Sequence, residues 1–214
     1  MEIKVCGMRE SNNLKDLLSR VNPDWVGLIF FQKSLRFVED SKADFIEPIE
    51  SKKVGVFVNE NLDHILEKIE KFRLDVVQLH GSETVEYLEQ LLEKSDVKVW
   101  KVFPVSDHVD WELMIKYEGL VSRFLFDTAS KKHGGTGRKF NWDLIKEYPF
   151  ETPFMLSGGL DSTSVRDLAS LVGHCPKLVG VDLNSNFEKS PALKDVDKLL
   201  KFKKELNELL AQKG

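Results

Sequence analysis

Short apolar runs alternate along this chain with segments in which apolar residues return every three or four positions. The runs occupy residues 3–6, 25–31, 53–58, 75–79, 97–103, 122–127, 153–156 and 178–182. Continuous runs of this length predict strands that are buried on both faces. The segments between them place apolar side chains on one helical face, as in Leu62, Ile65, Leu66, Ile69 and Phe72, then Val85, Leu88, Leu91 and Leu92, and finally Val196, Leu199, Leu200, Leu206, Leu209 and Leu210. These stripes predict helices that pack on a sheet.

Eight strands that alternate with helical segments predict an α/β fold, a single (β/α)8 TIM barrel domain over residues 1–214. The second helix, after Arg36, is expected to be short or irregular because Pro48 interrupts its weak apolar pattern. An open doubly wound sheet also alternates strands with helices and stays an alternative. Against it, no glycine-rich dinucleotide fingerprint follows an early strand.

Composition narrows the class of protein. The chain is 42% hydrophobic and 31% charged, which is typical of a globular domain with a sizeable core. A net charge of -4 with scattered lysines gives no basic footprint for nucleic acid. The longest apolar run, 25–31, is far shorter than the roughly 18 residues of a membrane helix, and the N-terminal residues do not resemble a signal peptide. We therefore expect a cytoplasmic protein with no nucleic-acid or membrane partner, whose two cysteines, Cys6 and Cys175, are free thiols.

Polar residues follow the predicted strands, and in a barrel the carboxyl ends of the strands form the active-site rim. The first strand ends in Cys6, and the sixth delivers Asp127. On its own, Cys6 could be a small buried hydrophobe and Asp127 a helix cap or loop carboxylate. Two strand tips that face one substrate from different sides would suit a base and an acid.

Glycine-rich segments follow the sixth and seventh strands. Residues 134–137 (GGTG) predict a loop that can close over Asp127, after which Asn141 is a plausible helix N-cap. Gly158 and Gly159 precede a helix that starts at Asp161 or Ser162, and residues 184–186 (NSN) supply further hydrogen-bond donors. Adjacent loops of this kind predict a phosphate site, although the two glycines could simply form a tight turn.

These blocks together resemble one known family. Residues 4–8 (KVCGM), 27–30 (GLIF), 34–38 (SLRFV), 54–59 (VGVFVN), 77–81 (VQLHG), 127, 134–137, 140–142 (FNW), 157–160 (SGGL) and 180–182 (GVD) resemble phosphoribosylanthranilate isomerase of tryptophan biosynthesis, in the same order. The resemblance extends to Lys194 and Asp195. It implies an Amadori rearrangement of N-(5'-phosphoribosyl)anthranilate, no cofactor, no metal ligands, a phosphosugar-anthranilate substrate and a monomer or homodimer.

The resemblance also implies roles for individual residues. Cys6 is the expected general base, Asp127 the expected general acid and Arg36 the expected partner of the anthranilate carboxylate. The other expected substrate-binding residues are His80, Gly158, Gly159, Asp182, Ser185 and Asn186. Arg36 could instead be a surface arginine, and His80 could merely cap a loop.

The chain departs from the family pattern at three positions. Leu35 replaces a proline that is usual in the family, and Asn186 and Ala192 replace glycines. Asparagine tolerates the left-handed conformation, so we expect Asn186 to keep its turn.

Cys6, the expected base, requires a neighbouring group that stabilises its thiolate. A thiol with an ordinary pKa of about 8.5 is mostly protonated at neutral pH. Strand alternation puts Lys4 on the same face as Cys6, about 6–7 Å below it, so Lys4 could stabilise the thiolate. Alternatively, Lys4 fills the barrel and pairs with a carboxylate such as Glu2.

Two other functions stay open from the sequence. A related sugar-phosphate barrel with Schiff-base or decarboxylating chemistry would need a lysine at a strand tip, and Lys101 in the fifth strand is the candidate. A non-catalytic barrel could also bind a phosphosugar as a sensor, but binding alone requires neither Cys6 nor Asp127.

Overall fold

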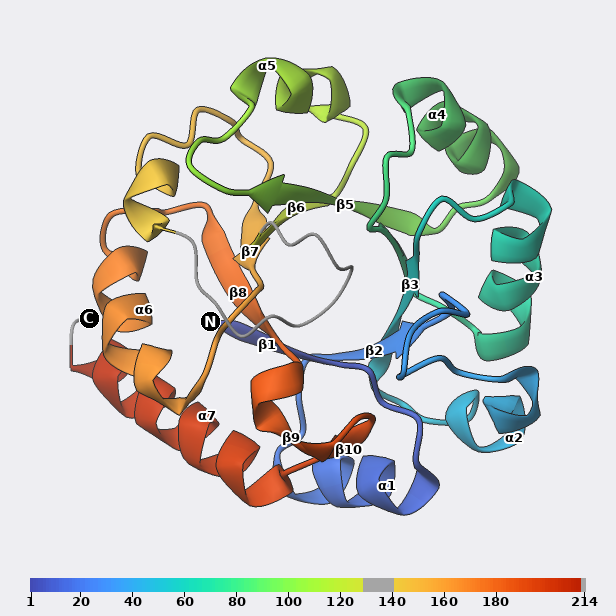
Figure 1. Ribbon diagram of the computed structural model, residues 1–214, viewed down its shortest axis with the longest axis horizontal. Coiled ribbons are helices and arrows are strands. Elements are labelled where there is room, and N and C mark those ends of the chain that lie inside the picture. Colours follow the sequence, from blue (N-terminus) through green and yellow to red (C-terminus); the bar gives the residue numbers. More distant parts are fainter. Residues whose placement is uncertain (129–140, 213–214) are drawn as a thin grey trace.

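A closed parallel barrel forms the centre of the protein. The computed structural model describes residues 1–128 and 141–212, and within them eight strands follow one another around the barrel in sequence order, with β8 paired to β1 (Figure 1). The strands are β1 (Glu2–Cys6), β2 (Trp25–Ile29), β3 (Lys52–Phe57), β4 (Val76–Leu79), β5 (Lys98–Val105), β6 (Arg123–Thr128), β7 (Phe154–Leu156) and β8 (Leu178–Leu183). The predicted TIM barrel is confirmed, and the open doubly wound alternative is wrong.

Helices surround the barrel on its outer side (Figure 1). They are α1 (Ser11–Arg20), α2 (Ala43–Ile46), α3 (Leu62–Phe72), α4 (Val85–Lys94), α5 (Trp111–Met114), α6 (Val165–Val172) and α7 (Val196–Ala211). The second helix is indeed short: a 3-10 turn, Asp40–Lys42, leads into the four residues of α2. Asn141 caps a 3-10 turn, Trp142–Ile145, in place of the α-helix that its position predicted.

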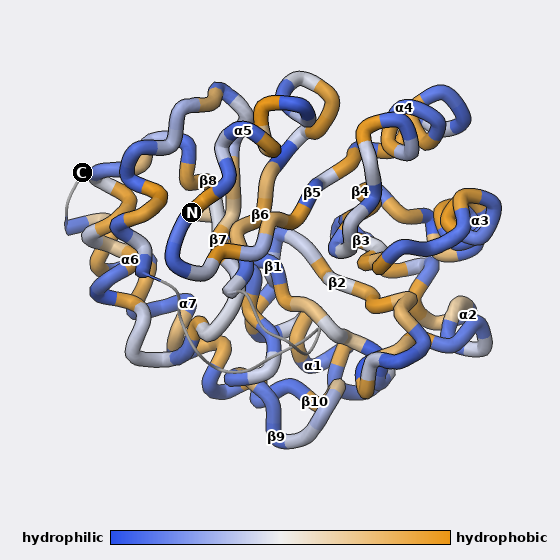
Figure 2. The backbone as a smooth tube through the Cα atoms, turned by 45° about the horizontal axis from the view of Figure 1, so that its top comes forward, coloured by the Kyte–Doolittle hydropathy of each residue, from blue (hydrophilic) through white to orange (hydrophobic). Residues whose placement is uncertain are grey.

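The strands bury apolar side chains on both faces, as their continuous apolar runs require. Outward-facing residues pack against the helices in one large core, and the helices alternate between apolar and polar residues along their length (Figure 2). A separate core fills the barrel interior and consists of Trp25, Val54, Val76, Trp100, Val102, Leu125 and Met155. The barrel is thus a solid scaffold on which loops at its rim can be positioned.

A short hairpin departs from the simple barrel pattern. Strands β9 (Glu188–Ser190) and β10 (Leu193–Lys194) form an antiparallel pair between β8 and α7, close to α1 (Figure 1). Asn13 of α1 accepts a hydrogen bond from the Lys194 backbone N–H at 2.7 Å, so the hairpin is tied to the start of the chain. No helix within residues 1–128 and 141–212 is long and apolar enough to cross a membrane.

Candidate active site

A cavity of about 270 Å³ opens at the carboxyl ends of the strands. Of the nine residues predicted for the site, eight line it: Cys6, Arg36, His80, Asp127, Gly158, Gly159, Asp182 and Ser185. They come from the ends of β1, β6 and β8 and from the loops after β2, β4, β7 and β8. Closure of the barrel therefore brings together residues that lie far apart in the sequence.

Cys6 is the last residue of β1 and is almost fully buried. Gly27 on β2 leaves the space for its sulfur, because a Cβ at Gly27 would lie 2.7 Å from Cys6 Sγ. Burial raises the pKa of the Cys6 thiol, while the ammonium groups of Lys4 and Lys194 act in the opposite direction. Burial and the Asp182 carboxylate thus favour the neutral thiol of Cys6, and the two cations favour its ionised form.

Lys4 lies inside the barrel and is inaccessible to solvent, as predicted for its inward position. Its Nζ donates to Asp182 Oδ2 at 2.7 Å, so its carboxylate partner is Asp182 and not Glu2. Burial disfavours the ammonium, but Asp182 and Cys6 together outweigh burial and hold the pKa of Lys4 above its usual value. Among the described residues, the other Asp182 oxygen, Oδ1, has no hydrogen-bond partner, and Asp182 itself lines the cavity.

Asp127 lies near the end of β6 and is in direct contact with His80 at the cavity. His80 Nε2 lies 3.2 Å from Asp127 Oδ2, and His80 Nδ1 lies 3.5 Å from Gln78 Nε2. Gly158 lies directly against the carboxyl group, since a Cβ there would overlap Asp127 Oδ1 and the Thr128 backbone. The predicted glycine-rich loop 134–137 lies outside the described residues.

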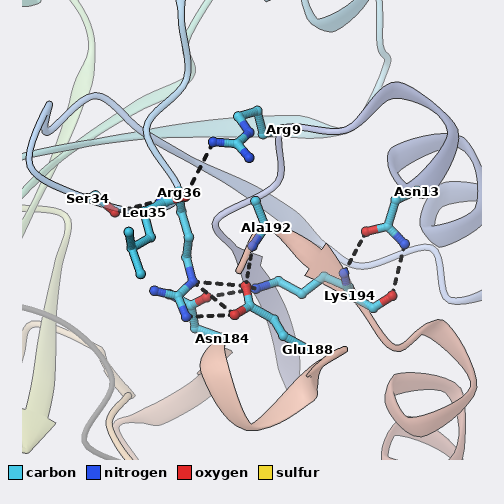
Figure 3. A network of polar contacts seen from close by, with 9 residues as sticks. All are labelled: Arg9, Asn13, Ser34, Leu35, Arg36, Asn184, Glu188, Ala192 and Lys194. Carbon is cyan, nitrogen blue, oxygen red and sulfur yellow. Dashed lines mark hydrogen bonds and ion pairs between the residues drawn. The ribbon is translucent and has the colours of Figure 1, made fainter. Parts of the chain in front are cut away.

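Arg36 is held by a buried carboxylate of the β9–β10 hairpin (Figure 3). Its Nε donates to Glu188 Oε1 at 2.9 Å, and its Nη2 donates to Glu188 Oε2 at 2.6 Å. Lys194 Nζ donates to the same Glu188 Oε1 at 2.5 Å and to Asn184 Oδ1 at 2.7 Å. Arg36 is thus part of a fixed ionic network at the cavity wall, not a free surface arginine.

The loops after β7 and β8 form one side of the cavity. Gly158 and Gly159 both have a positive φ, of 76° and 70°, which glycine adopts at little cost. Asp161 caps the 3-10 turn Ser162–Ser164 through a capping box, and this turn continues into α6. The predicted start at Asp161 or Ser162 is that of the 3-10 turn, whereas α6 itself begins at Val165.

Asn186 does not line the cavity. Its side-chain Nδ2 donates to the carbonyl oxygens of Gly159 and Leu160 at 3.2 and 3.1 Å, so it ties the loop after β8 to the loop after β7. The expectation that Asn186 keeps a left-handed turn is wrong, because it lies in the 3-10 turn Ser185–Phe187. The left-handed residue of this segment is Ala192, with φ 67°.

Glu188 and Lys194 were not predicted as site residues. They belong to a hairpin beyond the last barrel strand, and neither residue follows the end of a barrel strand directly. The signal available was that two oppositely charged residues flank a proline turn at Pro191, within a segment that the family resemblance covers. Asn184, which accepts a hydrogen bond from Lys194 at the cavity, is indicated by the sequence only as part of a donor-rich turn.

Lys101 is excluded as a Schiff-base residue by its contacts. Its Nζ donates to Glu83 Oε2 at 2.9 Å and to the Gly81 carbonyl at 2.7 Å, and it is absent from the cavity lining. Both side chains of this pair are buried. Cys175 is a buried free thiol on the segment that precedes β8, at the opposite end of the barrel from Cys6.

Fold and cavity together define a (β/α)8-barrel enzyme with its site at the carboxyl ends of the strands. A family model for N-(5'phosphoribosyl)anthranilate (PRA) isomerase matches residues 3–205. The chain belongs to this family.

Individual relatives agree with the family assignment. The N-(5'-phosphoribosyl)anthranilate isomerases of Parabacteroides distasonis and Phocaeicola vulgatus are 41% and 42% identical, over 94% and 91% of this chain and 91% and 92% of theirs. The crystal structure of the Thermotoga maritima phosphoribosyl anthranilate isomerase has a TM-score of 0.84 and 31% identity, and covers 97% of this chain and 99% of that one. A phosphoribosyl anthranilate isomerase in complex with reduced 1-(o-carboxyphenylamino)-1-deoxyribulose 5-phosphate has a TM-score of 0.81 and 30% identity, over 97% and 99% of the two chains.

Proposed function

We propose that the protein converts N-(5'-phosphoribosyl)anthranilate into 1-(2-carboxyphenylamino)-1-deoxyribulose 5-phosphate, an isomerisation of tryptophan biosynthesis. The observation that carries the proposal is that Cys6, Asp127 and Arg36 line the same cavity. This arrangement offers a proton acceptor, a proton donor and a carboxylate-binding group to one ligand. The names of the relatives and the ligand of the related complex supply the substrate.

Asp127 is the proposed general acid. Opening the furanose ring breaks the bond between C1' and the ring oxygen, whose electron pair stays on oxygen and takes up a proton. The anthranilate nitrogen donates its lone pair to C1', and an iminium ion results. His80, 3.2 Å from Asp127 Oδ2, is placed to hold the carboxyl group toward the ring oxygen and to return a proton to it after each turnover.

Cys6 is the proposed general base. The iminium ion makes the proton on C2' acidic, and its removal gives an enolamine that tautomerises to the aminoketose. A thiol must first lose its own proton for this step, and the ammonium groups of Lys4 and Lys194 favour the thiolate. Asp182 holds Lys4 in place at the cavity floor.

The remaining cavity residues are proposed to bind the two anionic ends of the substrate. Arg36 can take the anthranilate carboxylate with parallel hydrogen bonds. Backbone N–H groups of the Gly158 and Gly159 loop, together with Ser185, are suited to the phosphate, because both loops border the cavity beside a helix start. Asn186 joins these two loops and is proposed to support the phosphate site without touching the ligand.

The experiment follows the loss of anthranilate fluorescence when freshly made phosphoribosylanthranilate is mixed with wild type, Cys6→Ser or Asp127→Asn. Loss of a general acid or base lowers kcat by about 10²–10⁴-fold. Both variants are nearly isosteric with the wild type, so circular dichroism should show intact folds. Wild-type turnover with unaffected variants would refute the residue roles, and an inactive wild type would refute the activity.

A further inference from the structure

The Arg36 guanidinium uses only one of its two hydrogen-bonding edges within the protein. Nε and Nη2 form the side edge, and both donate to Glu188. Among the described residues, Nη1 has no hydrogen-bond partner, and Figure 3 shows one guanidinium nitrogen on the side away from Glu188. The end edge, made of Nη1 and the second Nη2 hydrogen, is therefore free for a ligand at the cavity.

Glu188 is held independently of Arg36. Besides Arg36, it accepts hydrogen bonds from Lys194 Nζ at 2.5 Å and from the Ala192 backbone N–H at 3.1 Å (Figure 3). The side chains of Glu188 and Lys194 are 4% and 0% exposed. A ligand would not readily displace a carboxylate fixed in this way, because moving Glu188 would also break its ion pair with Lys194 and leave that buried ammonium without a charged partner.

The ion network also leaves positive charge for an incoming anion. Two cations, Arg36 and Lys194, surround the single carboxylate of Glu188. A ligand carboxylate on the end edge of Arg36 would neutralise the remaining positive charge, whereas an Arg36–Glu188 pair without Lys194 would have no net charge to offer it.

The geometry points to Glu188 as a positioning residue that holds the side edge of Arg36, with Lys194 as its anchor, so that Arg36 presents its end edge to the substrate carboxylate. Glu188 and Lys194 themselves do not contact the substrate. The inference rests on the proposed function, since it assigns the specificity of that same site for an ortho-carboxylated aromatic amine.

Two ligands test this inference: the reduced product analogue with its ring carboxyl group, and the same compound with a plain phenyl ring. Their Kd values are measured by calorimetry for wild type, Glu188→Gln and Lys194→Met. We expect the wild type to prefer the carboxylated ligand, and each variant to lower that preference by roughly tenfold or more. The Kd of the phenyl ligand should stay close to the wild-type value, which general damage to the site would not permit.

Glu83→Gln is the matched control. Glu83 is equally buried and pairs with Lys101, but it has no contact with Arg36. Its variant should keep the wild-type preference even if both ligands bind more weakly.

If Glu188→Gln does not fold, the double variant Glu188→Gln/Lys194→Met removes the unpaired ammonium and should still show the lowered preference. A wild-type preference in the Glu188 and Lys194 variants would overturn the inference. So would tighter binding of the carboxylated ligand by Glu188→Gln, since Glu188 would then be a competitor of the ligand. Wild-type turnover of phosphoribosylanthranilate, measured alongside, separates these results from a failure of the proposed function, which would remove the inference as well.

Discussion

Glycines lie directly against the side chains of the site and limit where those side chains can go. Gly27 borders Cys6, Gly158 borders Asp127, and a Cβ at Gly7 would lie 2.6 Å from Arg36 Cδ. At each position a single methyl group would push the functional side chain out of place. At the scale of single residues, the exact position of the functional side chains therefore depends on neighbouring residues that have no side chain.

Gly158→Ala should lower kcat by about 10- to 100-fold, because the new methyl group displaces the Asp127 carboxyl group. Gly119→Ala is the control, since Gly119 also has a positive φ, of 81°, but has no atom within 4 Å of its would-be Cβ. Both variants should lose about 1–2 kcal/mol of folding free energy from backbone strain. Steady-state kinetics and urea unfolding separate the two effects, and a wild-type kcat in Gly158→Ala would contradict the expectation.

The titration of Cys6 can be followed by its alkylation in a Cys175→Ser background. Burial raises the pKa of Cys6, so the alkylation rate should rise with pH and reach half its maximum above the pKa of an ordinary thiol. Lys4→Met should raise this midpoint further, because it removes a cation and leaves Asp182 unpaired beside the thiol. Lys101→Met removes an equally buried lysine elsewhere and should leave the midpoint unchanged. An unshifted midpoint in Lys4→Met would exclude Lys4 from activating the thiol.

At the scale of secondary-structure elements, the two ends of the barrel have different roles, one in ligand binding and one in stability. The carboxyl ends of the strands carry the cavity, whereas a cluster of Glu2, Trp25, Trp100 and Arg123 closes the amino ends of β1, β2 and β6. Arg123 lies against both Trp25 and Trp100, 5.1 and 5.0 Å from the two rings, which contact each other edge to face. Its Nη2 donates to Glu2 Oε1 at 2.8 Å, and Trp25 also donates to Glu2. This end has the features of a stability face.

Arg123→Ala should therefore destabilise the fold without reaching the chemistry. Loss of two ring contacts, the ion pair and the buried stem should lower the free energy of unfolding by about 2–3 kcal/mol, with kcat unchanged. Arg20→Ala is the control: Arg20 pairs with Asp16 and Asp197 at the surface, where such pairs contribute little to stability. Equal unfolding midpoints for the two variants in urea would contradict this account.

At the scale of the whole molecule, the barrel could be predicted because parallel strands that are buried on both faces have continuous apolar sequences. Each of the eight runs lies within a residue or two of an observed strand. Cys6 and Asp127 could be placed at the rim because closure brings all strand ends to one side. The Arg36–Glu188 pair could not be predicted, because the two residues are 152 positions apart and Glu188 belongs to a hairpin that is not part of the repeating strand–helix pattern. The left-handed residue is Ala192 and not Asn186. Residue type shows which side chains tolerate this conformation, but not where the hairpin requires it.

A ligand that fills the cavity should stabilise the entire fold, since its lining comes from β1, β2, β3, β4, β6 and β8 and from the loops after β2, β3, β4, β7 and β8. The reduced product analogue at 100 times its Kd should raise the free energy of unfolding by about 2.7 kcal/mol. For a chain of this size, the Tm should rise by roughly 5–10 °C. Differential scanning calorimetry measures the shift, and the dephosphorylated analogue at the same concentration should give a smaller one. Identical melting curves with and without the phosphorylated compound would show that it does not occupy the native cavity.

The hairpin of β9 and β10 also determines when during synthesis the site can be completed. Arg36 leaves the ribosome 152 residues ahead of Glu188, and Lys194 follows later still. Until then, the guanidinium lacks the carboxylate that fixes its orientation. A nascent or prematurely terminated chain that stops short of this hairpin carries the proposed acid and base but cannot hold the arginine beside them, so recognition of the aromatic carboxylate is among the last properties the growing polypeptide acquires.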